Sequence, residues 1–212
     1  MQPLTLGAIL YPGFELLDLF GPLEMFTSLP SERLTVVMVA QNKGSVTAGS
    51  MSNAPMPSVV ADYDFADAPL LDLLLLPGGV GTFPELENPA MLDFLKTRAA
   101  TAQITASVCT GSALLAAAGV LDGRRATSNK QVFDMARVVS DKVDWIEAAR
   151  WVDDGPVVTS SGVSAGIDMS LAIIARLFGE ETAETIANGA EYTWHRDAET
   201  NPFITHLNKM MG

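Results

Sequence analysis

The segment 70–76, with the sequence LLDLLLL, constrains the fold of this chain more than any other feature. In an extended conformation it places leucines on both faces, as do central strands of parallel sheets, which are covered on both sides. Pro77, Gly78 and Gly79 then end the run. The segment therefore predicts a central strand in an α/β fold.

The rest of the chain alternates apolar strand patterns with helical ones. We expect further strands at 4–11, 34–40 and 104–108, and a hairpin formed by 148–152 and 157–160 around Asp153-Asp154-Gly155. Helices are expected at 16–28, 89–102, 111–118 (with Gly119 as its C-terminal cap), 129–139, 164–178 and 180–191, and short extended pieces and loops at 43–63. This alternation predicts one α/β domain over 1–212, with a mostly parallel sheet and helices on both faces. Chemistry in such folds lies at the carboxyl ends of the strands.

Charge and cysteine content narrow the class of protein. The formal net charge is −12, which argues against nucleic acid and anionic membrane surfaces as partners, because both need clustered Lys and Arg. The single cysteine excludes an intramolecular disulfide and fits a reducing compartment. The first residues show no basic region or cleavage site of a secretory signal, and their apolar stretch is too short to span a bilayer. We therefore expect a cytoplasmic protein.

Cys109 lies where an apolar strand runs directly into a helix rich in small residues. Such a turn lifts a nucleophile out of the sheet and places it at the amino end of a helix, where an anion is favoured. Lowering a thiol pKa by two units needs about 2.7 kcal/mol, part of which a helix end would provide. A lone cysteine is more often a small buried hydrophobe. The strand–cysteine–helix context favours the catalytic interpretation.

Two further features belong to the same predicted edge of the sheet. The Gly78 and Gly79 amides could form an oxyanion hole with the amide of Cys109 or Thr110. A tight turn is the simpler alternative, and the loop fits neither common phosphate-binding motif. Asp18 stands among apolar residues, and burial would keep it protonated as a general acid. The alternatives are an exposed carboxylate near the helix start and the nearby Glu15 as the acid.

A rival nucleophile is Ser164, because Gly162-Val163-Ser164-Ala165-Gly166 matches G-x-S-x-G between a strand and a helix. Asp197 and His206 follow in the order of a hydrolase triad. The chain is short for that fold, however, and we interpret Ser164 as a helix N-cap. Asp168 would be a first-turn acid or a pocket residue. Two histidines and one cysteine make no convincing zinc set, and a Cys-His dyad would form only if the tail folds back over Cys109. We interpret the segment around His195 as a packed terminal segment.

Four segments carry a resemblance to a known family: AILYPGFELLDLFGPLE, LLLPGGVGT, ASVCTGSALLAAAGVLDGRRAT and SSGVSAGIDMSLAII. Along nearly its whole length the chain resembles the PfpI/ThiJ superfamily. Asp18, together with Cys109-Thr110-Gly111, is most similar to its isonitrile hydratases. The resemblance implies a flavodoxin-like sandwich, a homodimer, a small-molecule substrate, and no metal or organic cofactor.

The resemblance also implies roles for individual residues. Cys109 would attack the isonitrile carbon to give a covalent thioimidate, and Asp18 would handle the protons and activate water. The site would be lined by Thr110, Gly78, Gly79, Gly162, Val163 and Ser164. One departure is Thr127-Ser128-Asn129-Lys130, where these hydratases tend to read Thr-Thr-His-Trp. The alternatives are a redox-responsive protein with an oxidisable Cys109, or a glyoxalase- or amidase-like member of the superfamily.

Overall fold

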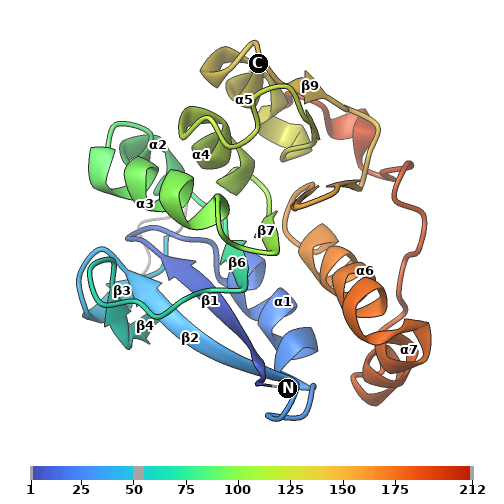
Figure 1. Cartoon of the computed structure of the whole chain (residues 1–212). Coiled ribbons are helices and arrows are strands. Elements are labelled where there is room, and N and C mark those ends of the chain that lie inside the picture. Colours follow the sequence, from blue (N-terminus) through green and yellow to red (C-terminus); the bar gives the residue numbers. More distant parts are fainter. Residues whose placement is uncertain (1, 50–54, 211–212) are drawn as a thin grey trace.

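A computed structural model describes residues 2–49 and 55–210. Its main sheet has seven strands in the order β10-β11-β7-β6-β1-β2-β5 (Figure 1). Every neighbouring pair is parallel except β10 with β11. The strands of this sheet are β1 (Leu4–Leu10), β2 (Leu34–Ala40), β5 (Tyr63–Asp64), β6 (Leu73–Leu76), β7 (Ile104–Ser107), β10 (Trp151–Asp154) and β11 (Val157–Ser160). The predicted mostly parallel α/β fold is confirmed.

Two small ladders lie outside the main sheet. Strands β3 (Gly44–Thr47) and β4 (Ser58–Ala61) pair antiparallel, within the region expected to hold short extended pieces. Strands β8 (Arg125–Ala126) and β9 (Asp144–Trp145) pair parallel.

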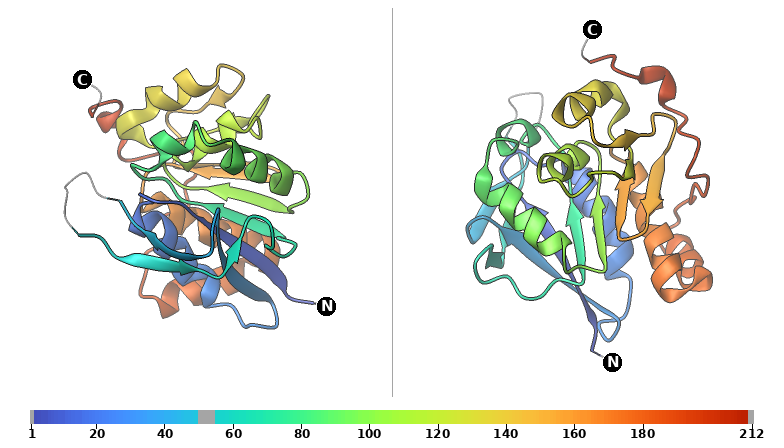
Figure 2. Two further views of the ribbon diagram at one scale, coloured as in Figure 1. Left: turned by 90° about the vertical axis from the view of Figure 1, so that its left-hand side faces the viewer. Right: turned by 45° about the horizontal axis from the view of Figure 1, so that its top comes forward.

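Helices cover both faces of the main sheet (Figure 2). On one face, α1 and α7 both pack on α6, and on the other α4 contacts α2, α3 and α5. The helices are α1 (Leu16–Thr27), α2 (Thr82–Glu85), α3 (Pro89–Ala99), α4 (Gly111–Ala117), α5 (Phe133–Val139), α6 (Ala165–Phe178) and α7 (Glu180–Gly189), with 3-10 turns η1 (Lys130–Val132) and η2 (Ile204–His206). Between these layers all four residues of β6 are buried, which agrees with the two-sided leucine pattern.

Most predicted elements differ from the structure by a few residues at an end, and two strands differ in an informative way. The central strand starts at Leu73 and not at residue 70, because Leu70 is exposed and the Asp72 carboxylate accepts the Thr5 N–H. The hairpin strand predicted at 148–152 is β10, since its register pairs Trp151 with Ser160. The backbone of residues 148 and 150 bonds to the C-terminal chain instead.

The helix predicted at 129–139 is divided into η1 and α5. Asn129 is extended and its side chain accepts the Gln131 N–H, while Val132 leaves helical geometry with a φ of −132°. The break falls at Val132, and the first turn of α5 is capped from the C-terminal chain, because the Asp134 N–H donates to Asn208 Oδ1. Gly119, in contrast, follows α4 with a φ of +74°, as expected for a C-terminal cap.

After α7 the chain runs as an extended tail, which we define as residues 190–210, along the β10 edge and up to α5 (Figure 1). Its backbone bonds to Ala148 and Arg150 and, further on, to Lys130 and Gln131. The tail therefore lies across the carboxyl ends of β11 and β7. None of the helices in residues 2–49 and 55–210 is long and apolar enough to cross a membrane.

The central strand should dominate stability. Leu75→Ala removes a fully buried side chain from β6, and we expect it to lower the free energy of unfolding by about 2–5 kcal/mol. Val60→Ala, at a side chain that is 63% exposed, should change it by less than about 0.5 kcal/mol. Urea denaturation followed by circular dichroism measures both, and equal effects would contradict the assigned burial.

Candidate active site

Cys109 occupies a sharp turn between β7 and α4. Its φ is +60°, in the left-handed region that residues other than glycine rarely adopt. Its N–H donates to the carbonyl oxygens of Ser160 and Ser161 at the end of β11, which holds the turn. Gly111 is required there, because a Cβ would lie 2.6 Å from the Leu76 carbonyl oxygen. The strand-to-helix position predicted for Cys109 is therefore present.

Hydrogen-bond donors from three segments surround the Cys109 sulfur. The Asn129 Nδ2 donates to Sγ over 2.9 Å. The backbone N–H groups of Thr110 and Val163 also lower the pKa of the thiol by hydrogen bonding. Val163 has a φ of +45°, a second left-handed residue beside the cysteine. These donors stabilise the negative charge that develops on the sulfur when the thiol loses its proton.

Asp18 is fully buried on the first turn of α1. Its Oδ2 accepts the Gly78 N–H over 2.9 Å, and its Oδ1 has no hydrogen-bond partner among the described residues. Burial raises the pKa of Asp18 to about 7, and the charge of Glu15 adds to the rise. The carboxyl group therefore exchanges its proton near neutral pH, as expected from its apolar sequence context.

Burial also raises the pKa of the Cys109 thiol, and the charge of Asp18 raises it further. Desolvation of this side chain, which is 5% exposed, outweighs the three donors, so the net shift of the thiol pKa is upward, and the contribution of the helix end stays a prediction. A hydrogen bond from Cys109 in turn lowers the pKa of Asp18, so the two buried groups interact directly and share protons as a pair. The resting site holds a protonated thiol.

The loop 77–81 binds the parts of the site together. Gly79 N–H donates to Thr110 Oγ1 over 3.0 Å, and Thr110 Oγ1 also lies 2.8 Å from Thr82 Oγ1. At Gly78 a Cβ would lie 2.6 Å from the Thr110 nitrogen and 2.9 Å from Asp18 Oδ2, so only glycine fits.

The available amides differ from those expected for an oxyanion hole. Cys109 N–H faces the β11 carbonyls, so its predicted role as an oxyanion donor is wrong. Gly78 and Gly79 donate to Asp18 and Thr110, which gives the two glycines a positioning function.

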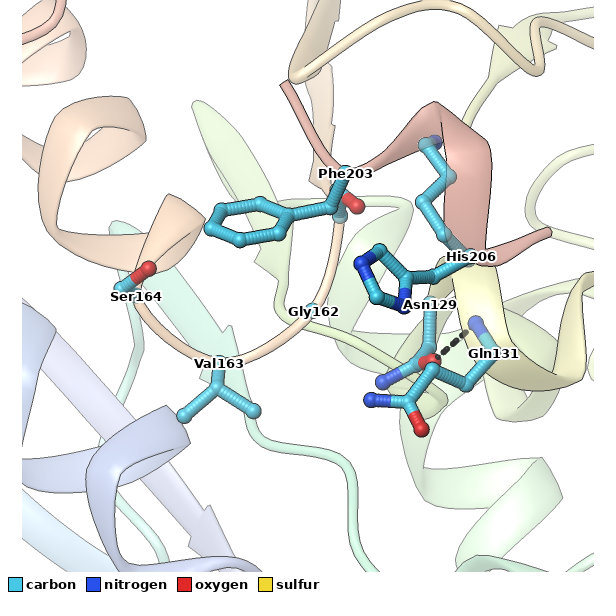
Figure 3. A pocket seen from close by; sticks show the side chains of 9 residues that line it. Asn129, Gln131, Gly162, Val163, Ser164, Phe203 and His206 are labelled. Carbon is cyan, nitrogen blue, oxygen red and sulfur yellow. Dashed lines mark hydrogen bonds between the residues drawn. The ribbon is translucent and has the colours of Figure 1, made fainter. Parts of the chain in front are cut away.

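A cavity of about 320 Å³ lies next to the site, although Cys109 itself is not among its lining residues (Figure 3). Its lining includes Asn129 and Val163, the two residues outside the strand-to-helix turn that bond to Sγ. The described residues that line it are Asn129, Lys130, Gln131, Ser161, Gly162, Val163, Ser164, Phe203 and His206. The predicted lining residues 162–164 are therefore joined by two groups, 129–131 and 203–206, that the sequence interpretation did not include.

Asn129 could have been found from the sequence, since it stands where the resembling hydratases carry a histidine. His206 had a weaker signal, because its approach to the site depends on how the tail folds back. The tail does so: His206 reaches the cavity, while His195 lies at the start of the tail, where its N–H donates to Asp168 Oδ1 over 2.9 Å.

The hydrolase alternative finds no geometric support among the described residues. Ser164 precedes α6, but its side chain caps no amide of that helix, so the capping prediction is right in position only. Asp197 is exposed and its carboxylate accepts the N–H groups of residues 199 and 200. Asp168 is the first-turn acid of α6 and forms a buried ion pair with Arg150. The described residues also contain no group of three side chains suited to a metal ion.

A cysteine on a left-handed strand-to-helix turn of a parallel sheet, opposed by a buried carboxyl group, defines a class of α/β proteins with a cysteine-centred site. Residues 8–176 match the DJ-1/PfpI family, and the chain belongs to this family. The assignment to the PfpI/ThiJ superfamily and its flavodoxin-like fold is confirmed.

Individual relatives indicate which branches lie near. The isonitrile hydratase of Pseudomonas putida is 36% identical over 194 residues, covering 89% of this chain and 78% of that protein. Protein DJ-1 homolog A of Arabidopsis thaliana is 30% identical over 148 residues, covering 65% of this chain and 37% of that protein. The crystal structure of a THiJ/PfpI family protein from Pseudomonas syringae aligns with a TM-score of 0.79 at 33% identity, covering 91% of this chain and 76% of that one. The family therefore includes both a named hydratase and DJ-1 homologues.

The buried carboxyl group should make stability depend on pH. An unfolded aspartate has a pKa near 3.9, so between about pH 4 and pH 7 the folded state binds the extra proton and stability falls as pH rises. Asp18→Asn removes this dependence. From pH 5 to pH 8, the free energy of unfolding of the native protein should fall relative to that of the variant by roughly 2–3 kcal/mol.

Urea denaturation at the two pH values measures the difference. Glu24→Gln, an exposed position on the same helix, is the matched control and should follow the native protein. Parallel pH dependences for the native protein and Asp18→Asn would contradict the raised pKa.

Proposed function

We propose that this protein hydrates isonitriles to N-substituted formamides through a covalent thioimidate on Cys109. The observation that carries the proposal is the pairing of a protonated buried thiol with a buried carboxyl group of pKa about 7. An isonitrile carbon must gain both a nucleophile and a proton, and this pair holds both. The 36% identity to the Pseudomonas putida isonitrile hydratase supports the same chemistry.

In the first step the Cys109 sulfur bonds to the isonitrile carbon while the thiol proton passes to that carbon by way of Asp18. The product is a thioimidate, R–N=CH–S, and Asp18 ends the step as it began. The donors Asn129 Nδ2, Thr110 N–H and Val163 N–H stabilise the sulfur as its proton leaves. The high thiol pKa suits this step, because the proton is needed on the substrate.

In the second step water adds to the thioimidate carbon. Asp18 in its carboxylate form accepts a proton from the water and passes this proton to the imine nitrogen, which gives R–NH–CH(OH)–S and leaves Asp18 as a carboxylate again. The C–S bond then breaks, the hydroxyl proton returns to sulfur through Asp18, and R–NH–CHO leaves. Because Gly78 N–H fixes Oδ2, the unpartnered Oδ1 is the oxygen available for these transfers.

The alternative of a redox-responsive protein is supported by the similarity to DJ-1 homologues, but the structure of the site supports it less. Peroxide reacts with thiolates, and the raised pKa of Cys109 keeps the thiol protonated. The glyoxalase- or amidase-like alternative lacks a side chain observation in its favour. The homodimer and the cytoplasmic location also stay predictions.

Turnover of cyclohexyl isocyanide to the formamide tests the proposal. We expect Cys109→Ala to lower kcat by at least about 10³-fold, because the covalent route is lost. Asp18→Asn should lower it by about 10²–10⁴-fold through loss of proton transfer. Glu24→Gln should retain full activity, and intact-mass spectrometry of Asp18→Asn should detect an adduct of the mass of one isonitrile.

Two other reagents separate the alternatives in the same assay. Methylglyoxal turnover without isonitrile turnover would favour the glyoxalase-like function. Stoichiometric oxidation of Cys109 by dilute peroxide, again without isonitrile turnover, would favour a redox-responsive protein. Isonitrile turnover that survives Cys109→Ala would refute the covalent route.

Asn129 should matter through its amide N–H. Asn129→Asp keeps the oxygen that accepts the Gln131 N–H but replaces the donor at Sγ with a carboxylate. We expect kcat/KM to fall at least tenfold, equivalent to about 1.4 kcal/mol, and alkylation of Cys109 by iodoacetamide to shift to higher pH. Asn129→His, which retains a ring N–H donor, should keep most of the activity. Equal losses in both variants would show that the donor is unimportant.

A further inference from the structure

The rim of the cavity comes from the C-terminal tail. Figure 3 shows Phe203 and His206 reaching over the cavity from the tail, opposite Val163 and Ser164. Their rings are 6.3 Å apart, and both residues are exposed. Cys109, which is only 5% exposed, lies behind the lining residue Asn129, whose Nδ2 bonds to its sulfur. A bound isonitrile would therefore direct its reacting carbon toward Cys109 and its substituent toward the rim.

Two sets of contacts fix the tail on either side of this rim. Before it, the buried Asp168 carboxylate accepts hydrogen bonds from Arg150 Nε over 2.7 Å and from Tyr192 Oη over 3.0 Å. After it, the Asn208 N–H donates over 2.7 Å to the carbonyl oxygen of Lys130, which itself lines the cavity. His206 lies between these anchors, so the fold holds its imidazole at the cavity.

The polar side chains that line the cavity are hydrogen-bond donors or basic groups. Among the described lining residues none is acidic, although the chain as a whole has a formal net charge of −12. The Lys130 ammonium is turned away into the protein, where it donates to Thr127 Oγ1 over 2.7 Å and to the Ser128 carbonyl oxygen over 3.2 Å. Asn129 Nδ2 is engaged by the sulfur. His206, with the Gln131 side chain beside it, is therefore the group left to contact the substituent of a bound isonitrile (Figure 3).

We propose that His206 is a specificity-determining residue and that it selects isonitriles whose substituent ends in a carboxylate. This inference rests on the proposed hydratase function and names its substrate class. An imidazole offers an N–H donor in either protonation state, and a hydrogen bond to a charged group is among the stronger ones. An acid-free rim in an acidic protein avoids repelling such a substrate. The carboxylate stays at the open end, where it retains part of its hydration.

Isocyanoacetate and its methyl ester form a matched pair of probes, because they differ only in the charge at the far end. For the native protein we expect kcat/KM to be at least tenfold higher for the acid than for the ester. His206→Ala should raise KM for the acid at least tenfold, with kcat and all constants for the ester nearly unchanged. His206→Lys, which places an N–H donor at the rim, should retain much of the preference, and the exposed neighbour Thr205→Ala should behave as native.

The outcomes separate this inference from the proposed function. Equal kcat/KM for acid and ester, or equal loss of both in His206→Ala, would overturn the role of His206 while leaving the hydratase function intact. If neither probe is hydrated although cyclohexyl isocyanide is, the role of His206 is overturned, and if cyclohexyl isocyanide is not hydrated either, the proposed function fails. The rim is then tested by titration calorimetry of N-formylglycine and its methyl ester with Cys109→Ala. Binding of the acid that is lost in Cys109→Ala/His206→Ala would support the carboxylate subsite, and its absence would refute it.

Discussion

The close approach of three chain segments at Gly78 holds the site together. Its N–H donates to Asp18 from α1, and the space that a Cβ would need is taken by Thr110 from the start of α4. The carboxyl end of the central strand β6 therefore places the acid and the nucleophile turn against each other. Such contact is possible only because β6 is covered by helices on both faces, so that one edge of the sheet collects residues from both layers.

This geometry has an electrostatic consequence. Asp18 and Cys109 are both buried, and the charge of Asp18 raises the pKa of Cys109, while a hydrogen bond from Cys109 lowers the pKa of Asp18. A site of this kind does not store a thiolate at neutral pH. It keeps a proton on the pair and has donors ready at the sulfur, which is suited to reactions that consume a nucleophile and a proton together. A cysteine whose task is oxidation would gain more from exposure and a low pKa.

The main strands and turns of the fold could be predicted from the sequence, because the signals for them are local. The leucines of 73–76, the strand-to-helix turn at Cys109 and Gly119 after α4 each follow from residues within a few positions. The pKa of Cys109 could not be obtained in this way. Its sign depends on burial by distant segments, and local reasoning included only the helix end.

The residues that line the cavity likewise fall into two groups. Local sequence signals predict one group, and long-range contacts bring the other to the cavity. The residues 162–164 lie at a strand end, where sites are expected, and they were predicted as lining. Asn129 and His206 belong instead to an irregular segment and to a tail whose course is set by long-range contacts, above all the buried pair of Arg150 with Asp168. The half of the site nearest the sulfur thus depends on the strand ends at the edge of the sheet, while the outer half depends on how one buried carboxylate anchors the tail. Substrate choice can therefore change through the tail without disturbing the groups that perform the chemistry.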